Sequence, residues 1–223
     1  MIEPLLQMIV LAFVFGTLFG TISATVYRQR LPEVESAAYY MLSRFAEISG
    51  YVGSAMSLVL FPMASEAHDQ GAENDKPLRQ TIFGTAVVTA GLAFAFAFLA
   101  KPIFSITATW KAYADYAYLL APMTIGNGIS IVVGAISSYE TACRRFNALI
   151  ALTVLLGLWI IFLVSFTGCG FYHGILTDDF IAWMESLHMA KLSSITYASI
   201  GASILQAVIL FVIFKRNKQR RLT

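Results

Sequence analysis

The chain has 223 residues, of which 58% are hydrophobic and only 13% are charged, with a net charge of +2. Its mean hydropathy of +0.71 lies well outside the range of ordinary soluble domains. This composition argues against a soluble enzyme and against a nucleic-acid-binding protein. It is typical of an integral membrane protein with several spans.

Six long apolar stretches predict an all-α, polytopic membrane helix bundle, because a helix needs about 20 apolar residues to cross ~30 Å of hydrocarbon. We expect these helices at residues 5–27, 36–64, 79–100, 113–139, 147–168 and 193–214. Together they form one six-helix unit over residues 1–215, followed by a basic tail at 216–223. Lys101 and Pro102 mark the expected end of the third helix.

The distribution of basic residues predicts the orientation of these helices. One side of the membrane collects nine of them, namely Lys76, Arg79, Arg144, Arg145, Lys215, Arg216, Lys218, Arg220 and Arg221. The other side collects five, namely Arg28, Arg30, Lys101, Lys111 and Lys191. Because basic loops stay in the cytoplasm and an even number of spans puts both termini on one side, we expect both termini in the cytoplasm. The protein is then a multi-pass protein of the cytoplasmic (inner) membrane.

The second predicted helix carries a polar stripe. Its members recur at steps of four and three, at Ser36, Tyr40, Ser43, Glu47, Gly50, Ser54 and Ser57, and Arg44 lies beside them. In a membrane such a face must be buried against protein or must line a wet cavity. A single six-helix unit would leave it facing lipid, so we expect a partner to cover it.

Two interpretations of Arg44 remain open. In the first, Arg44 and Glu47 neutralise each other as a structural ion pair. In the second, Arg44 faces an aqueous lumen and binds an anionic substrate, while Glu47 orients it or takes protons. The second makes Arg44, Glu47, Tyr40 and Ser43 candidate substrate-binding residues.

Weaker polar patterns occur on two other helices. The fourth carries Tyr116, Asn127, Ser130, Gly134 and Ser137, and the sixth carries Thr196, Ser199, Ser203 and Gln206. Small polar residues at these spacings usually form helix–helix packing surfaces. We add Asn127 to the candidate substrate-binding residues. The third and fifth helices are nearly uniformly apolar and are expected to face lipid.

Catalytic and metal-binding patterns are weak in this sequence. An enzyme that transfers a chemical group would need a pair of carboxylates or a histidine placed near the membrane interface. Asp178 and Asp179 are the only candidate pair, and the sequence offers no third catalytic residue beside them. Cys143 and Cys169 flank the fifth predicted helix, so ~40 Å separates them and they cannot form a disulfide. We therefore expect no enzyme activity, no cofactor and no metal.

One region resembles a known family. The run Ala37-Ala38-Tyr39-Tyr40, then Arg44, then Phe61-Pro62-Met63-Ala64-Ser65-Glu66-Ala67-His68 is similar to the eighth helix and following cytoplasmic loop of polysaccharide flippases. These transporters belong to the multidrug/oligosaccharidyl-lipid/polysaccharide transporter superfamily. The similarity extends over residues 1–215, with degenerate motifs, and matches the C-terminal lobe of the family.

The resemblance implies a MATE-like fold and a function. Flippases of this family move lipid-linked oligosaccharides across the cytoplasmic membrane by alternating access, through a basic central cavity between two six-helix lobes. This chain has only one lobe's worth of helices, so the resemblance implies a second lobe or a homodimer partner besides membrane lipids. A small-molecule or cation antiporter of the same superfamily, and a truncated lobe that does not transport, remain alternatives.

Overall fold

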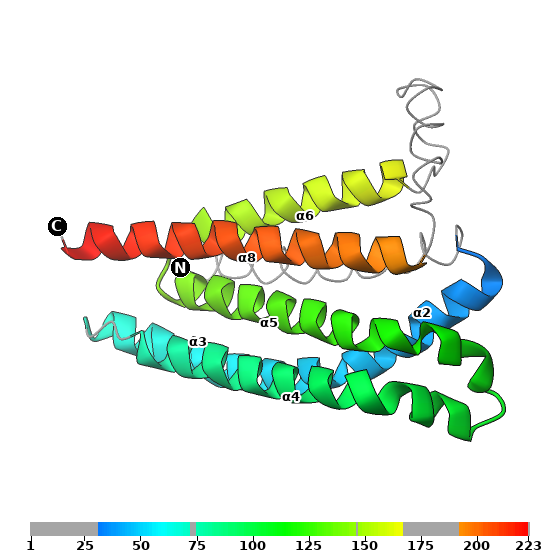
Figure 1. Cartoon of the computed structure of the whole chain (residues 1–223). Coiled ribbons are helices and arrows are strands. Elements are labelled where there is room, and N and C mark those ends of the chain that lie inside the picture. The colour runs from blue at the N-terminus through cyan, green and yellow to red at the C-terminus, as the bar shows by residue number, and fades with distance from the viewer. Residues whose placement is uncertain (1–30, 72–74, 146, 167–191, 223) are drawn as a thin grey trace.

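The computed structural model describes residues 31–71, 75–145, 147–166 and 192–222, and the secondary structure in these ranges is entirely helical (Figure 1). The elements are α2 (Glu33–Ala46), α3 (Ile48–Asp69), α4 (Lys76–Ile106), the 3₁₀ helix η1 (Lys111–Leu119), α5 (Leu120–Ala142), α6 (Asn147–Phe166) and α8 (Leu192–Leu222). The first predicted helix, 5–27, and the loop that holds Asp178 and Asp179 lie outside the described residues.

Four described stretches are long and apolar enough to cross a membrane. They are Glu33–Asp69, Lys76–Ile106, Lys111–Ala142 and Leu192–Gln219, whereas α6 offers a shorter apolar segment at Ile150–Trp159. Large apolar side chains cover their outer surfaces; Leu58 is 77% exposed, Phe83 72% and Phe94 70%. An apolar surface of this extent is stable in lipid but not in water. The arrangement supports a membrane protein, while the six-span count stays a prediction.

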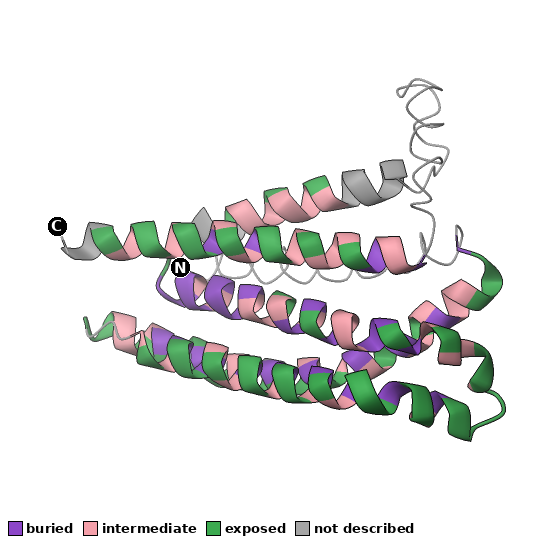
Figure 2. Ribbon diagram, viewed as in Figure 1, coloured by how far each residue is buried: buried purple, intermediate pink, exposed green. Residues whose placement is uncertain are grey.

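Helix α5 is the centre of the bundle. It contacts every other described element, and the long helices α3, α4, α6 and α8 lie beside it in roughly the same direction (Figure 1). Buried residues are concentrated on α5, whereas much of α4 and α8 is exposed (Figure 2). The candidate Asn127 of this helix is half-buried.

Helix α4 is not uniformly lipid-facing as expected, because one of its faces is buried. Thr81, Thr85 and Thr89 recur every four residues along this face, and Ala93 and Ala100 extend it. Residues four apart lie on the same side of a helix, so small side chains let α4 pack closely against α3 and α5. The composition of the helix does not reveal this stripe, because threonine is only weakly polar and alanine only weakly apolar.

The contact between α4 and α5 predicts that Gly128→Ala is destabilising. A Cβ on Gly128 would lie 2.3 Å from Thr89 Cγ2 and 2.8 Å from Thr89 Cβ. Rotation of Thr89 cannot relieve the contact with its own Cβ, so the helices must separate, at a cost of about 1–3 kcal/mol. We expect a lower unfolding midpoint and lower membrane abundance. Gly134→Ala, which meets nothing within 4 Å, is the control, and equal midpoints for the two variants would contradict this packing.

Helices α4 and α8 extend furthest beyond their predicted ends. Helix α4 continues past Lys101 and Pro102 to Ile106. Helix α8 continues to Leu222, so residues 216–222 of the expected basic tail are helical.

Charged residues from distant parts of the chain meet at one end of the bundle. Arg144 Nη2 lies 2.9 Å from Asp69 Oδ1, and Lys218 of α8 pairs with Asp75 before α4. Lys76, Arg144 and Lys218 were predicted to share one side of the membrane. These contacts place their segments at the same end of the helices, as that prediction requires.

A buried acid stabilises the same end. The side chain of Glu140 on α5 is fully buried, and its Oε2 accepts a hydrogen bond of 2.7 Å from Asn217 Nδ2 on α8. Arg145 Nη1 lies 3.8 Å from Glu140 Oε1. Tyr139 donates to Asp75 Oδ1 over 3.1 Å. The last turns of α8 are therefore attached to α5 by a carboxylate that water does not reach.

Candidate functional site

The second predicted helix is broken at Glu47, which separates α2 from α3. The Gly50 N–H donates to the Glu47 carbonyl over 2.8 Å, an i to i+3 bond that tightens the chain at this point. The Ala46 carbonyl instead accepts from Ser49 Oγ at 2.8 Å and from Asn127 Nδ2 at 3.0 Å. Side chains thus satisfy the backbone group that the break frees, as a membrane interior requires.

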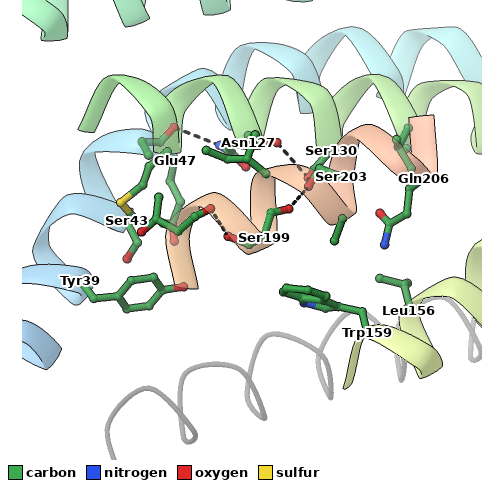
Figure 3. A pocket seen from close by; sticks show the side chains of 18 of the residues that line it. Tyr39, Ser43, Glu47, Asn127, Ser130, Leu156, Trp159, Ser199, Ser203 and Gln206 are labelled. Carbon is green, nitrogen blue, oxygen red and sulfur yellow. Dashed lines mark hydrogen bonds between the residues drawn. The ribbon is translucent and has the colours of Figure 1, made fainter. Parts of the chain in front are cut away.

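A cavity of about 620 Å³ adjoins the break, between α2, α5, α6 and α8. Its walls carry Tyr39, Tyr40, Ser43, Arg44, Glu47, Met123, Gly126, Asn127, Ser130, Leu156, Trp159, Thr196, Ser199, Ser203 and Gln206, among others. All five candidate residues from the sequence therefore lie around one space, and Figure 3 labels Ser43, Glu47 and Asn127 among them. Tyr40, Ser43 and Glu47 of the polar stripe line this space together with α5, α6 and α8, while Tyr40 stays 58% exposed. The partner expected to cover the stripe stays a prediction.

The cavity reaches the middle of two of the apolar stretches. Asn127 is central in Lys111–Ala142, and Gln206 is central in Leu192–Gln219. Along α8 the lining runs from Thr196 to Gln206, which corresponds to ~15 Å of helix. A polar cavity at this depth is a functional-site candidate because lipid alone cannot solvate polar groups.

Arg44 is the cationic group of the cavity. Its Nη1 donates to Glu47 Oε2 over 3.0 Å, and its Nη2 donates to the Tyr40 hydroxyl over 2.9 Å. The guanidinium carbon also lies 4.9 Å from the centre of the Tyr40 ring. The Arg44 side chain is nevertheless 58% exposed. Since a guanidinium has five N–H donors, these bonds leave capacity for an incoming anion.

Ser43 and Asn127 contribute mainly to the shape of this site. The Ser43 hydroxyl donates to the Tyr40 carbonyl over 2.9 Å. Both N–H groups of Asn127 are used, because Nδ2 donates to the Ala46 carbonyl and, over 3.1 Å, to Ser49 Oγ. Only the carbonyl oxygen of Asn127 is left to accept from a ligand. We therefore interpret Asn127 as the residue that holds the broken helix against α5.

A ladder of hydroxyl groups continues from Asn127 along α5 and α8. Ser130 Oγ and Ser203 Oγ are 3.1 Å apart, and Ser203 donates to the Ser199 carbonyl over 3.0 Å (Figure 3). The packing role predicted for these serines agrees with these bonds. Trp159 and Tyr39, which the sequence analysis did not select, complete the opposite wall. The sequence around Trp159 and Tyr39 does not indicate that these two side chains line a cavity rather than face lipid.

Comparisons with protein-family models, curated proteins and solved structures found no match for this chain. The resemblance to polysaccharide flippases therefore stays an expectation drawn from the sequence.

The described lining residues of the cavity offer groups that can bind an anion. Among its described lining residues only Arg44 and Glu47 are charged, and they already form an ion pair. Arg44, Tyr40 and Glu47 form one cluster beside the break between α2 and α3, which suits reversible capture of an anion.

Proposed function

We propose that this chain is a subunit or lobe of a transporter that moves lipid-linked oligosaccharide or polysaccharide precursors across the cytoplasmic membrane. The observation that carries the proposal is an accessible arginine beside the break between α2 and α3, in a cavity that reaches the middle of two membrane-length helices. Lipid-linked glycans carry a phosphate or diphosphate next to the first sugar, so their head group presents both an anion and hydroxyl groups.

The geometry of Arg44 suits a phosphate. A guanidinium offers parallel N–H donors that match two phosphate oxygens at once. We propose that phosphate oxygens accept the hydrogen bond that Arg44 now donates to Glu47, while Tyr40 keeps the guanidinium in place. Because Arg44 and Glu47 are both about half exposed, their pair contributes little to stability and separates easily.

The break at Glu47 suits alternating access. Discontinuous helices at the depth of the bilayer centre are typical of transporter binding sites, since the irregular backbone there lines a cavity. We propose that α2 and α3 move relative to each other about Glu47 as the cavity changes the side to which it opens. A second lobe, or a second copy of this chain, would form the remaining wall of the translocation path.

A cation or small-molecule antiporter of the same superfamily is the second candidate. The partly exposed Glu47 carboxylate in the cavity favours it, because an acid at this depth can bind a proton or a cation. In that case Arg44 would regulate Glu47 rather than bind the substrate.

Gene deletion separates these functions. We expect cells that lack this protein to accumulate lipid-linked oligosaccharide on the inner leaflet and to lose surface glycan, with both restored by the intact gene. Unchanged glycan export together with altered cation or drug tolerance would favour the antiporter. Unchanged values for all three would show that the chain does not transport.

A further inference from the structure

The amide of Gln206 lines the cavity and has no hydrogen-bond partner among the described residues. The residue is only 8% exposed, yet its side chain lines the cavity, and no hydrogen bond joins it to another described residue. Figure 3 shows the amide pointing from α8 toward Leu156 and Trp159 on α6. Because an amide both donates and accepts hydrogen bonds, this group is available to a ligand that enters the cavity.

The walls around Gln206 differ from those around Arg44. The lining residues of α6 and α8 include no charged side chain. The hydroxyls of Ser199 and Ser203 already donate to backbone carbonyls, so they offer mainly acceptor capacity. Trp159 adds a large aromatic surface opposite them (Figure 3). These walls therefore fit a neutral ligand that has both hydroxyl groups and an apolar face.

We propose that Gln206 and Trp159 form a subsite for a neutral sugar ring. The apolar C–H face of the ring packs on the indole, and its hydroxyls pair with the amide of Gln206, which both donates and accepts. This inference rests on the proposed function, since it assigns the phosphate of a lipid-linked glycan to Arg44 and its sugar to the α6–α8 side. It adds two binding residues and an orientation for the head group.

Two soluble probes test this division on the purified full chain in lipid nanodiscs. Free neutral hexoses and N-acetylhexosamines, offered singly, report on the sugar subsite, and inorganic pyrophosphate reports on Arg44. Ligand-observed NMR measures both, because it detects weak binding. We expect Gln206→Leu to weaken sugar binding roughly tenfold and to leave pyrophosphate binding unchanged, whereas Arg44→Ala does the reverse.

Trp159→Phe supplies a second variant, which keeps an aromatic ring of smaller area. It should weaken sugar binding less than Gln206→Leu does and should preserve the unfolding midpoint. Leu205→Ala, an exposed neighbour of Gln206, is the control and should bind both probes normally. Sugar binding that survives Gln206→Leu, or the absence of any sugar binding to the unaltered protein, would overturn the subsite.

Failure of the proposed function would give a different result from failure of the sugar subsite. If deletion of the gene leaves glycan export intact while the purified chain still binds sugar through Gln206, the transport proposal fails and the subsite stands. If export depends on the chain but Gln206→Leu binds sugar and exports normally, the subsite fails alone.

Discussion

Replacement of Arg44 by alanine should reduce glycan export by roughly tenfold or more, since the loss of a charge-assisted, two-donor contact to phosphate removes at least that much affinity. Membrane abundance should stay normal, because Arg44 bonds only to residues of its own helix region, Tyr40 and Glu47. Arg44→Lys keeps the charge but loses the planar fork, so export should be partial. Surface glycan and membrane abundance, measured together, check the three expectations.

The double change Arg44→Ala with Glu47→Ala decides between the two interpretations of the pair. If Glu47 only neutralises Arg44, the double variant should behave better than Arg44→Ala, because no unpaired acid remains. If Arg44 binds substrate, export should stay low in both variants. Arg79→Ala removes an exposed cation outside the cavity and should export normally. Normal export with Arg44→Ala would eliminate the substrate role.

Replacement of Glu140 by alanine should be the most destabilising single change at the charged end of the bundle. The change deprives Asn217 and Arg145 of a fully buried carboxylate partner. Removing one member of a buried charged pair costs about 3 kcal/mol, so the unfolding midpoint and the membrane abundance should both fall. Glu140→Gln keeps an oxygen that can accept from Asn217 and should lose less.

Glu66→Ala is the matched control for this prediction. Glu66 is an exposed acid whose carboxylate accepts from Gln70 over 3.2 Å, four residues away, and such contacts contribute only a few tenths of a kcal/mol. Equal unfolding midpoints for Glu140→Ala and Glu66→Ala would show that the attachment of α8 to α5 contributes nothing to stability.

Hydrophobicity alone was enough to predict the helical membrane architecture of the described residues. It predicted helices within 36–64, 79–100, 113–139 and 193–214, and α2–α3, α4, α5 and α8 lie there. The polar stripe of the second helix also led to Arg44, Tyr40, Ser43 and Glu47, because charged and hydroxyl side chains are rare in such segments. These four residues and Asn127 line one cavity.

The details that escaped prediction depend on contacts between helices. The break at Glu47 has no proline or cap signal at that position; it is supported by Asn127, 81 residues from Ala46 along the chain. Trp159 and Tyr39 are aromatic residues of a kind that also faces lipid. Only the positions of α6 and α2 in the bundle show that these two side chains line the cavity. The extension of α8 to Leu222 likewise depends on Asn217 and Glu140, which meet only in the folded bundle.

Photo-crosslinking to the substrate tests the central claim most directly. A photoreactive phenylalanine analogue at position 156 lies on the cavity wall, and the same group at position 98 replaces an outward-facing phenylalanine of α4. In cells that synthesise the glycan, we predict that light attaches lipid-linked oligosaccharide at 156 and only phospholipid at 98. Adding Arg44→Ala should abolish the glycan adduct at 156. Export that proceeds without any glycan adduct at 156, or with equal adducts at 156 and 98, would contradict passage through this cavity.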